Sequence, residues 1–140
     1  MALREFPDMP AVDARQLNPL QLAHLGDTVW ELMVRSRVTW ARRNVRNMHK
    51  DAVACVNAQA QAEALKRIEP MLNDEEKDIV RRGINTHAHH AAPKNQDPVD
   101  YQHATALEAL MGYLYLTGQE ERIRELFQAS QEVATCRKQD

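Results

Sequence analysis

Two long apolar segments, each opened by an Asx–Pro pair, most constrain what this chain can fold into. Asn18-Pro19 and Asp97-Pro98 are both typical helix starts, because Asn or Asp caps the first turn and Pro fits the first helical position. The apolar pattern continues from the first pair to about Trp40 and from the second to about Leu116, where Thr117-Gly118 predicts a stop. Since both segments are helical, we expect an all-α protein.

The remaining pattern is helical as well. Apolar residues predict a second helix near Met48 to Arg67, and Asn73-Asp74-Glu75-Glu76 resembles a capping box that opens a third helix ending near Gly83. A last amphipathic helix follows Thr117-Gly118, and residues 84–97 are predicted to be a loop. We therefore expect one helical domain over residues 18–135, a loosely packed N-terminal arm over 1–17 and a C-terminal tail over 136–140.

Composition excludes several classes of protein. The 140 residues are 44% hydrophobic and 27% charged, as in a soluble globular domain. The uncharged apolar run at Ala109–Leu116 is too short to cross a bilayer, and no signal-peptide pattern opens the chain. Cys55 and Cys136 lie far apart and form no CxxC pair, which indicates reduced thiols. We expect a cytoplasmic protein with no membrane partner and no small-molecule cofactor.

Charge is unevenly distributed along the chain. The net charge is only -2, yet residues 35–50 hold six Lys or Arg and no acid, and residues 81–94 hold three more with three histidines. One such cluster alone is typical of a solvated helix end. Two acid-free clusters favour a polyanionic partner, because a phosphate backbone responds to the local potential.

Two acidic residues lie in the middle of the apolar helices. Asp27 follows Leu25-Gly26, and Glu108 lies within Ala106–Leu110. A carboxylate buried there loses hydration, at a cost of several kcal/mol unless something pairs with it. An arginine, a shared proton or a divalent cation could provide that pairing. Glu31, by contrast, is explained by an i,i+4 pair with Arg35.

Two glycines add to the case for a cation and leave the other two partners open. Gly26 precedes Asp27, and Gly112 lies one turn after Glu108. A glycine inside a helix is costly, so each indicates the close approach of another backbone. Two helices that cross at these glycines would bring the two carboxylates together, where a cation would relieve their repulsion. Oxygen ligands with retained waters suit magnesium, with manganese as the alternative.

At these same residues the sequence resembles the ribonuclease III family, specifically its minimal bacterial branch without a double-stranded-RNA-binding domain. The similarity covers about Asn18 to Phe127. Leu25-Gly26-Asp27 alone is a weak match, but followed by Pro93-Lys94-Asn95 and the helix Thr105–Leu116 it is specific. The other matching stretches are Gln16-Leu17-Asn18, Leu22-Ala23-His24, Ala60-Gln61-Ala62-Glu63 and Arg82-Gly83.

The resemblance implies a single ribonuclease III-type endonuclease domain that forms a homodimer and cuts double-stranded RNA. Asp27 and Glu108 correspond to the family's catalytic residues and metal ligands, and magnesium-bound carboxylates activate water to hydrolyse a phosphodiester. Larger members carry further acids where this chain has Leu20, Ala23 and Thr105, and the minimal branch shares these losses. The branch's role in maturing the large-subunit ribosomal RNA precursor is the expected function.

Six residues are candidate RNA contacts, because duplex RNA is recognised through phosphates and 2′-hydroxyls. They are His49, Lys50, Arg82, His87, Lys94 and Asn95. Each has a second interpretation: surface exposure for His49 and Lys50, a cap on its own helix for Arg82, and loop hydrogen bonds for Lys94 and Asn95. His87, His89 and His90 could instead bind zinc, but their spacing without cysteines or distant ligands disfavours it.

The helix from Pro19 to Trp40 is apolar on much of its circumference, which favours a homodimer that covers it. The main alternative to an enzyme is a non-catalytic helical RNA-binding or ribosome-assembly factor on the same fold, with the lost acids marking lost activity. A helical protein–protein adaptor with ordinary buried ion pairs is a third class.

Overall fold

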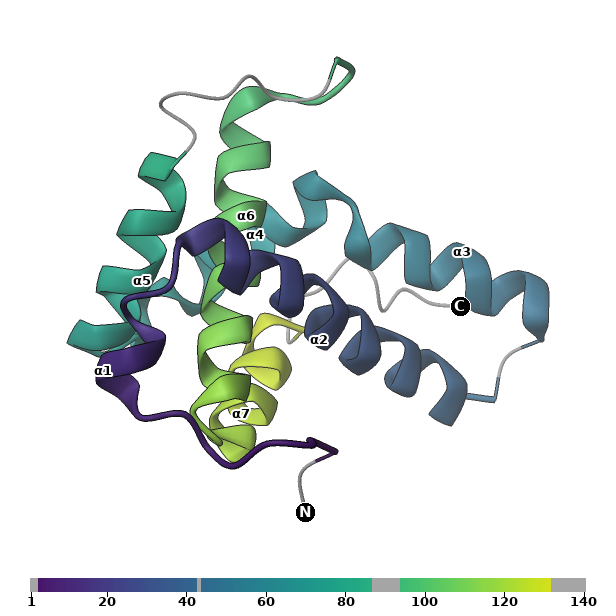
Figure 1. The fold of residues 1–140 in the computed structure, drawn as a ribbon. Coiled ribbons are helices and arrows are strands. Elements are labelled where there is room, and N and C mark those ends of the chain that lie inside the picture. Colours follow the sequence, from purple (N-terminus) through teal and green to yellow (C-terminus); the bar gives the residue numbers. More distant parts are fainter. Residues whose placement is uncertain (1–2, 43, 87–93, 132–140) are drawn as a thin grey trace.

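The computed structural model describes residues 3–42, 44–86 and 94–131, and these contain helices and no strand, which confirms the all-α class. Figure 1 shows the helices gathered around a central one, α6. In chain order they are α1 (Ala11–Ala14), α2 (Pro19–Trp40), α3 (Val45–Val56), α4 (Ala58–Ile68), the 3-10 turn η1 (Glu69–Met71), α5 (Asp74–Asn85), α6 (Pro98–Leu116) and α7 (Glu120–Ser130).

Helix α6 is the core of the domain. From Ala104 to Leu114 all but one of its residues are buried, and α2, α4, α5 and α7 all pack against it. A helix that is apolar around its whole circumference requires this kind of burial on all sides. The side chains of Trp30, Leu65, Ile79 and Phe127 close the core from the surrounding helices. No helix in the described part of the chain is long and apolar enough to cross a membrane.

The helix starts predicted from the sequence are confirmed. The Asn18 side chain accepts a hydrogen bond from the Leu20 N–H, and the Gln21 side chain accepts one from the Asn18 N–H. Asn73 and Glu76 form the same reciprocal capping box at α5. The Asp97 side chain accepts hydrogen bonds from two N–H groups at the start of α6. These bonds satisfy backbone donors that a helix leaves free at its first turn.

The single helix predicted near Met48 to Arg67 is wrong, because Asn57 divides it into α3 and α4. Asn57 has an extended backbone (φ -73°, ψ 162°), and its side-chain oxygen accepts a hydrogen bond from the Ala60 N–H, 2.8 Å away. Its side-chain amide also donates to the Val53 carbonyl in the preceding helix. Asn57 thus caps both helix ends, and the chain changes direction there.

Two further expectations differ from the structure. Helix α5 does not end near Gly83 but continues to Asn85, since that glycine serves a close packing contact: a Cβ there would lie 2.8 Å from the Ala106 Cα. The N-terminal arm is more closely packed than expected. Its Ala14 is fully buried in α1, and the Met9 N–H donates a hydrogen bond to the Leu116 carbonyl.

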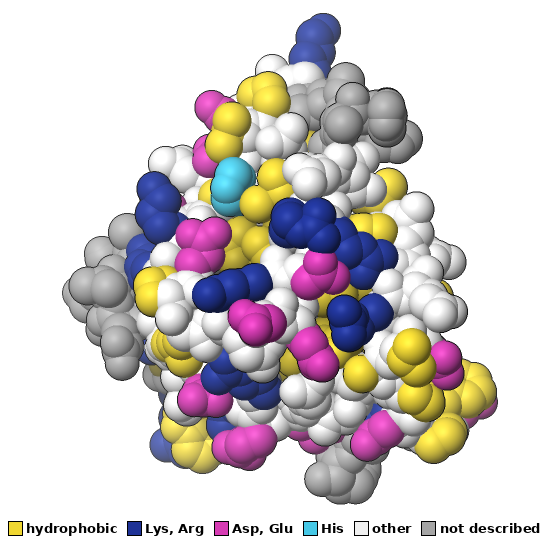
Figure 2. Space-filling view, turned by 90° about the vertical axis from the view of Figure 1, so that its left-hand side faces the viewer, with side chains coloured by type: hydrophobic (Ala, Val, Ile, Leu, Met, Phe, Trp, Pro, Cys, Tyr) yellow, Lys and Arg dark blue, Asp and Glu magenta, His cyan; other side chains and the backbone are white. Residues whose placement is uncertain are grey.

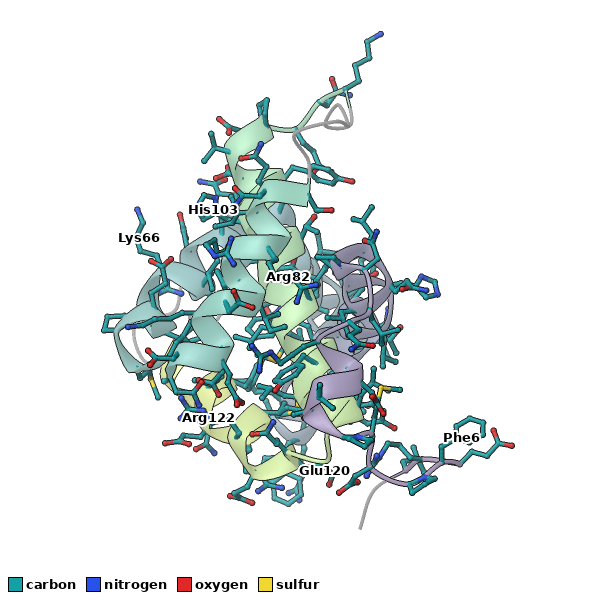
Figure 3. All side chains as sticks on the ribbon, turned by 60° about the vertical axis from the view of Figure 1, so that its left-hand side comes forward. Phe6, Lys66, Arg82, His103, Glu120 and Arg122 are labelled. Carbon is teal, nitrogen blue, oxygen red and sulfur yellow. The ribbon has the colours of Figure 1, made fainter. Side chains whose placement is uncertain are left out.

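A buried ion pair ties α5 to α7. The Glu76 carboxylate, 1% exposed, accepts hydrogen bonds of 2.8 Å from the Arg122 guanidinium, which also donates to the Met71 carbonyl. Burial alone would raise the pKa of Glu76, but the hydrogen bonds from Arg122 and from the Asn73 N–H outweigh it and lower that pKa. Figure 3 shows Arg122 between these elements.

We expect Arg122→Met to destabilise the protein by about 3 kcal/mol, because it leaves the Glu76 carboxylate buried without its partner. The matched control is Arg124→Met on the same helix, where Arg124 pairs with the exposed Glu121. An exposed pair contributes about 0–1 kcal/mol, so this control should unfold close to wild type. Urea denaturation of both variants checks the difference. Equal midpoints for the two variants would contradict the structural role of the buried pair.

Candidate active site

The candidate site lies where α2 crosses α6. A Cβ on Gly26 would lie 1.6 Å from the Glu108 carbonyl oxygen, and one on Gly112 would lie 2.0 Å from the Leu22 carbonyl oxygen. Both distances are far below any contact that a real Cβ makes, so only glycine permits this approach. The prediction that these glycines mark a close crossing is confirmed. At this crossing the backbone of Glu108 contacts Gly26, the residue directly before Asp27.

The two carboxyl groups meet at this crossing. Burial and then the negative charge of Asp27 raise the pKa of Glu108 to about 8, and a hydrogen bond between the two side chains adds to the rise. Near neutral pH the Glu108 carboxyl is therefore protonated and donates this hydrogen bond to Asp27. The two acids therefore share a proton, which is one of the three ways of stabilising a buried acid that the sequence analysis considered.

The burial of the two acids differs from the expectation. Asp27 was expected to lose its hydration inside an apolar helix, but its side chain is exposed, whereas Glu108 is only partly accessible. The reason is that Leu22, Gly26, Val29 and Trp30 belong to the buried face of α2, and Asp27 lies outside that face. The site therefore opens to solvent on the Asp27 side and is closed by protein on the Glu108 side.

A third polar side chain, Gln61, reaches this site from α4. It is 2% exposed, and its amide lies near enough to the Glu108 carboxyl to lower that group's pKa slightly against the larger raising effects. Its Nε2 has no hydrogen-bond partner of normal geometry among the described residues. Sequence analysis did not select Gln61, although it occupies the first position of the apolar stripe completed by Ala64, Leu65 and Ile68.

The oxygen donors at this site fit a hard divalent cation. These two carboxyl groups would repel each other once both are ionised, and Mg²⁺ or Mn²⁺ would stabilise that doubly ionised pair. Within the described residues there is no group of three or more His, Cys, Asp or Glu side chains that could hold a metal ion. Leu20, Ala23 and Thr105, the positions where the family resemblance implies further acids in larger members, carry no carboxylate. Water and phosphate oxygens would have to complete the coordination of a cation.

The candidate RNA contacts fall into different settings. His49 and Lys50 are exposed on α3, and Lys94 and Asn95 are exposed just before α6 begins. All four are accessible to a ligand. Arg82 is half-buried, and its guanidinium donates to the Leu17 carbonyl, 3.3 Å away, at the start of α2. His87, with His89 and His90, lies outside the described residues.

Acidic side chains from neighbouring residues lie beside the basic residues of the two acid-free segments and offset part of their charge. Arg35 pairs with Glu31, as predicted, and Arg81 pairs with Asp78 one turn before it. Figure 2 shows basic and acidic side chains interleaved on the face that it presents rather than a continuous basic surface. His49 and Lys50 on α3 and Lys94 before α6 are exposed and are the candidates for a local basic patch.

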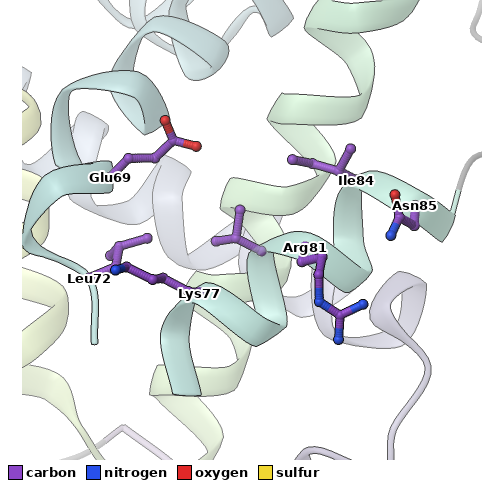
Figure 4. Close-up of a pocket in the computed structure, with 7 residues that line it drawn as sticks. Glu69, Leu72, Lys77, Arg81, Ile84 and Asn85 are labelled. Carbon is purple, nitrogen blue, oxygen red and sulfur yellow. The ribbon is translucent and has the colours of Figure 1, made fainter. Parts of the chain in front are cut away.

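An apolar hollow lies elsewhere, on the outer side of α5 (Figure 4). It is lined by Glu69, Leu72, Lys77, Val80, Arg81, Ile84 and Asn85. None of the site residues Asp27, Gln61 or Glu108 contributes to it. The hollow is separate from the crossing of α2 and α6 and does not belong to the candidate active site.

Comparison with known proteins identifies the class that this fold and site define. The profile of the Ribonuclease III domain matches residues 20–119, which include both carboxylates and the crossing of α2 and α6. The chain therefore belongs to the ribonuclease III family, whose activity is that of an endoribonuclease.

Curated relatives narrow this to the branch expected from the sequence. "Mini-ribonuclease 3" of Thermoanaerobacter sp. is 45% identical over 119 residues, 84% of this chain and 82% of that protein. "Mini-ribonuclease 3" of Symbiobacterium thermophilum is 47% identical over 116 residues, 81% of this chain and 88% of that protein. A crystal structure of a Fusobacterium nucleatum protein has a TM-score of 0.73 at 35% identity and covers 83% of this chain and 93% of that one. This chain spans 82–93% of the length of these three proteins.

Proposed function

We propose that this protein is a magnesium-dependent endoribonuclease that hydrolyses phosphodiester bonds in double-stranded RNA, with Asp27 and Glu108 as its catalytic residues. The observation that carries this proposal is the meeting of these two carboxyl groups where α2 crosses α6. Manganese is the alternative cation. The substrate that we propose is the large-subunit ribosomal RNA precursor, in the cytoplasm, as inferred from the family branch.

In this mechanism Asp27 and Glu108 would hold the cation. A bound divalent cation lowers the pKa of a coordinated water and offsets the negative charge that develops on the phosphate. Asp27 is exposed and Glu108 lies deeper, so a phosphodiester would approach from the Asp27 side. Because the Glu108 carboxyl is protonated near neutrality, it must lose its proton to act as a ligand, and Asp27 is the group that accepts the shared hydrogen bond.

The RNA would be held by side chains outside the carboxylate pair. His49 and Lys50 on α3, together with Lys94 and Asn95 before α6, are exposed donors for phosphates and 2′-hydroxyls. Arg82 is better placed to fix the start of α2, because it donates to the Leu17 carbonyl. Its contribution to RNA binding would therefore be through the position of α2.

We also propose that the protein works as a homodimer. In addition to the family resemblance, α2 carries large apolar side chains that the single chain leaves exposed, with Leu32 56% and Trp40 80% accessible. Of the two tryptophans on α2, Trp30 is buried within the chain and Trp40 is exposed. A second copy that covered these side chains would remove apolar surface from water.

The experiment uses the full chain and a long, perfectly paired RNA duplex, with and without Mg²⁺, beside Asp27→Asn. We expect cleavage only with the cation, and a loss of about a thousandfold in the variant, since several kcal/mol of transition-state stabilisation depend on the held cation. RNA binding should persist in the variant. Salt-sensitive binding without cleavage by wild type would favour a non-catalytic assembly factor, and no binding at all would favour a protein–protein adaptor.

A further inference from the structure

Gln61 stands out among the buried polar groups of this protein. In the described residues it is buried as completely as its apolar neighbours on α4, with 2% of its surface exposed, and its Nε2 is one of two buried side-chain nitrogens that make no hydrogen bond of normal geometry. A buried N–H without a partner is costly, so such groups are rare in folded proteins. Methionine or leucine would fill the same space on this apolar stripe without that cost. The placement of Gln61 therefore indicates a purpose other than packing.

The surroundings of Gln61 indicate what that purpose is. Helix α4 packs against α6, and the Gln61 amide faces the carboxyl of Glu108, whose other neighbour is Asp27. Asp27 approaches Glu108 from α2 and Gln61 approaches it from α4, so the carboxyl lies between a carboxylate and an amide. An amide can donate to a carboxylate oxygen, which a second carboxylate cannot do.

We propose that Gln61 is a positioning residue, whose side-chain amide donates to the Glu108 carboxylate and holds it in the orientation that binds the cation. This inference rests on the proposed function. Carboxylates that bind metal ions are usually held by such outer hydrogen bonds, and losing them weakens metal binding.

The experiment compares Gln61→Met, which keeps the length of the side chain and removes the amide, with Gln59→Met, its exposed counterpart on the same helix. Three quantities are measured for each: the thermal unfolding midpoint without divalent cation, Mn²⁺ affinity by electron paramagnetic resonance, and RNA cleavage as a function of Mg²⁺ concentration. For Gln61→Met we expect the Mn²⁺ affinity to fall about 10- to 100-fold and the half-saturating Mg²⁺ concentration to rise correspondingly. Gln59→Met should match wild type.

The unfolding midpoint separates positioning from packing. Because Gln61→Met removes a buried donor that makes no hydrogen bond of normal geometry in the cation-free protein, its midpoint should stay or rise by about 3 °C while metal binding weakens. A purely structural glutamine would show the reverse: a lower midpoint, with Mn²⁺ affinity unchanged when measured below that midpoint, and this result would overturn the inference. Gln61→Leu provides the same comparison if Gln61→Met folds poorly. Wild-type protein that binds no Mn²⁺ and cleaves no RNA would refute the proposed function, whereas failure of the inference alone shows as equal affinities in wild type and Gln61→Met.

Discussion

Gly26→Ala is expected to destabilise the protein by more than about 3 kcal/mol, because overpacking at a rigid backbone contact is the most costly kind of core substitution. The new methyl group would lie 1.6 Å from the Glu108 carbonyl oxygen, 2.6 Å from its carbonyl carbon and 2.8 Å from the Gly112 nitrogen. All three are backbone atoms within α6, so no side chain can rotate to make room. The two helices would have to separate. The gain of about 1 kcal/mol in helix propensity is too small to offset this.

Urea denaturation of a short series checks this prediction. Gly112→Ala, whose methyl group would lie 2.0 Å from the Leu22 carbonyl oxygen, should be nearly as destabilising, and Gly83→Ala, at 2.8 Å from the Ala106 Cα, less so. Ser36→Ala, at an exposed position on α2, is the control and should stay within about 0.5 kcal/mol of wild type. A Gly26→Ala protein as stable as this control would mean that α2 and α6 do not touch at this point.

The same contact determines the geometry of the site. Asp27 follows directly after Gly26, and Glu108 supplies the carbonyl that Gly26 contacts, so the distance between the two carboxyl groups depends on the distance between the two backbones. Any residue larger than glycine would move the acids apart even if the protein still folded. Stability and the catalytic arrangement are therefore linked through one packing contact between two helices.

Much of the fold could be predicted because local chemistry decides it. The Asx–Pro pairs at residues 18–19 and 97–98 and the capping box at Asn73 act within a single helical turn, and all three begin helices where the sequence indicated. The break at Asn57 was missed because apolar spacing continues across it and the capping function of Asn depends on its backbone angles. Gly83 was misread for a related reason: a glycine that ends a helix and one that permits close packing look the same in a sequence.

The candidate site was predictable in part. Acids inside apolar helices and glycines beside them predicted a meeting of Asp27 and Glu108, which the structure brings about. The sequence could not show that Asp27 lies at the exposed edge of α2, since that depends on the direction from which α6 crosses it. Gln61 is polar at a position where the stripe on α4 is otherwise apolar, and that signal could have identified it. Its neighbour Glu108 is 47 residues away in the chain, so only the fold reveals their contact.

The second large effect is expected for Glu108→Gln, which should slow cleavage about a thousandfold and yet stabilise the cation-free protein. Burial and the charge of Asp27 raise the pKa of Glu108 to about 8 from an ordinary value of 4.5. The folded state therefore holds a proton that the unfolded state releases at lower pH. Below pH 4.5 the carboxyl is protonated in both states, and the folded protein keeps its full stability. As the pH rises from 4.5 towards 8, the unfolded state gains from ionising Glu108 and the free energy of unfolding falls. Glutamine keeps the shape and cannot ionise, so it avoids this loss.

The measurement is the free energy of unfolding of wild type and Glu108→Gln between pH 5 and pH 9 in the presence of a chelator. The free energy of unfolding of Glu108→Gln should exceed that of wild type by an amount that grows with pH and levels off above pH 8 at about 3 kcal/mol. This is less than about 1.4 kcal/mol per pKa unit would give, because Glu108 keeps partial access to solvent. Glu31→Gln, on the surface of α2, is the control and should show no such growth. Parallel curves for wild type and Glu108→Gln would contradict a proton held at this carboxyl.

Addition of Mg²⁺ should reverse the order of stability. The cation and the proton compete for Glu108, so Mg²⁺ should stabilise wild type more at pH 8 than at pH 6, and cleavage by wild type should rise over the same interval. Glu108→Gln has one ligand fewer for the cation, and we expect it to gain little stability from Mg²⁺ and to cleave about a thousandfold more slowly. If Mg²⁺ stabilised the variant as much as wild type, the cation would bind elsewhere, and Glu108 would not be its ligand.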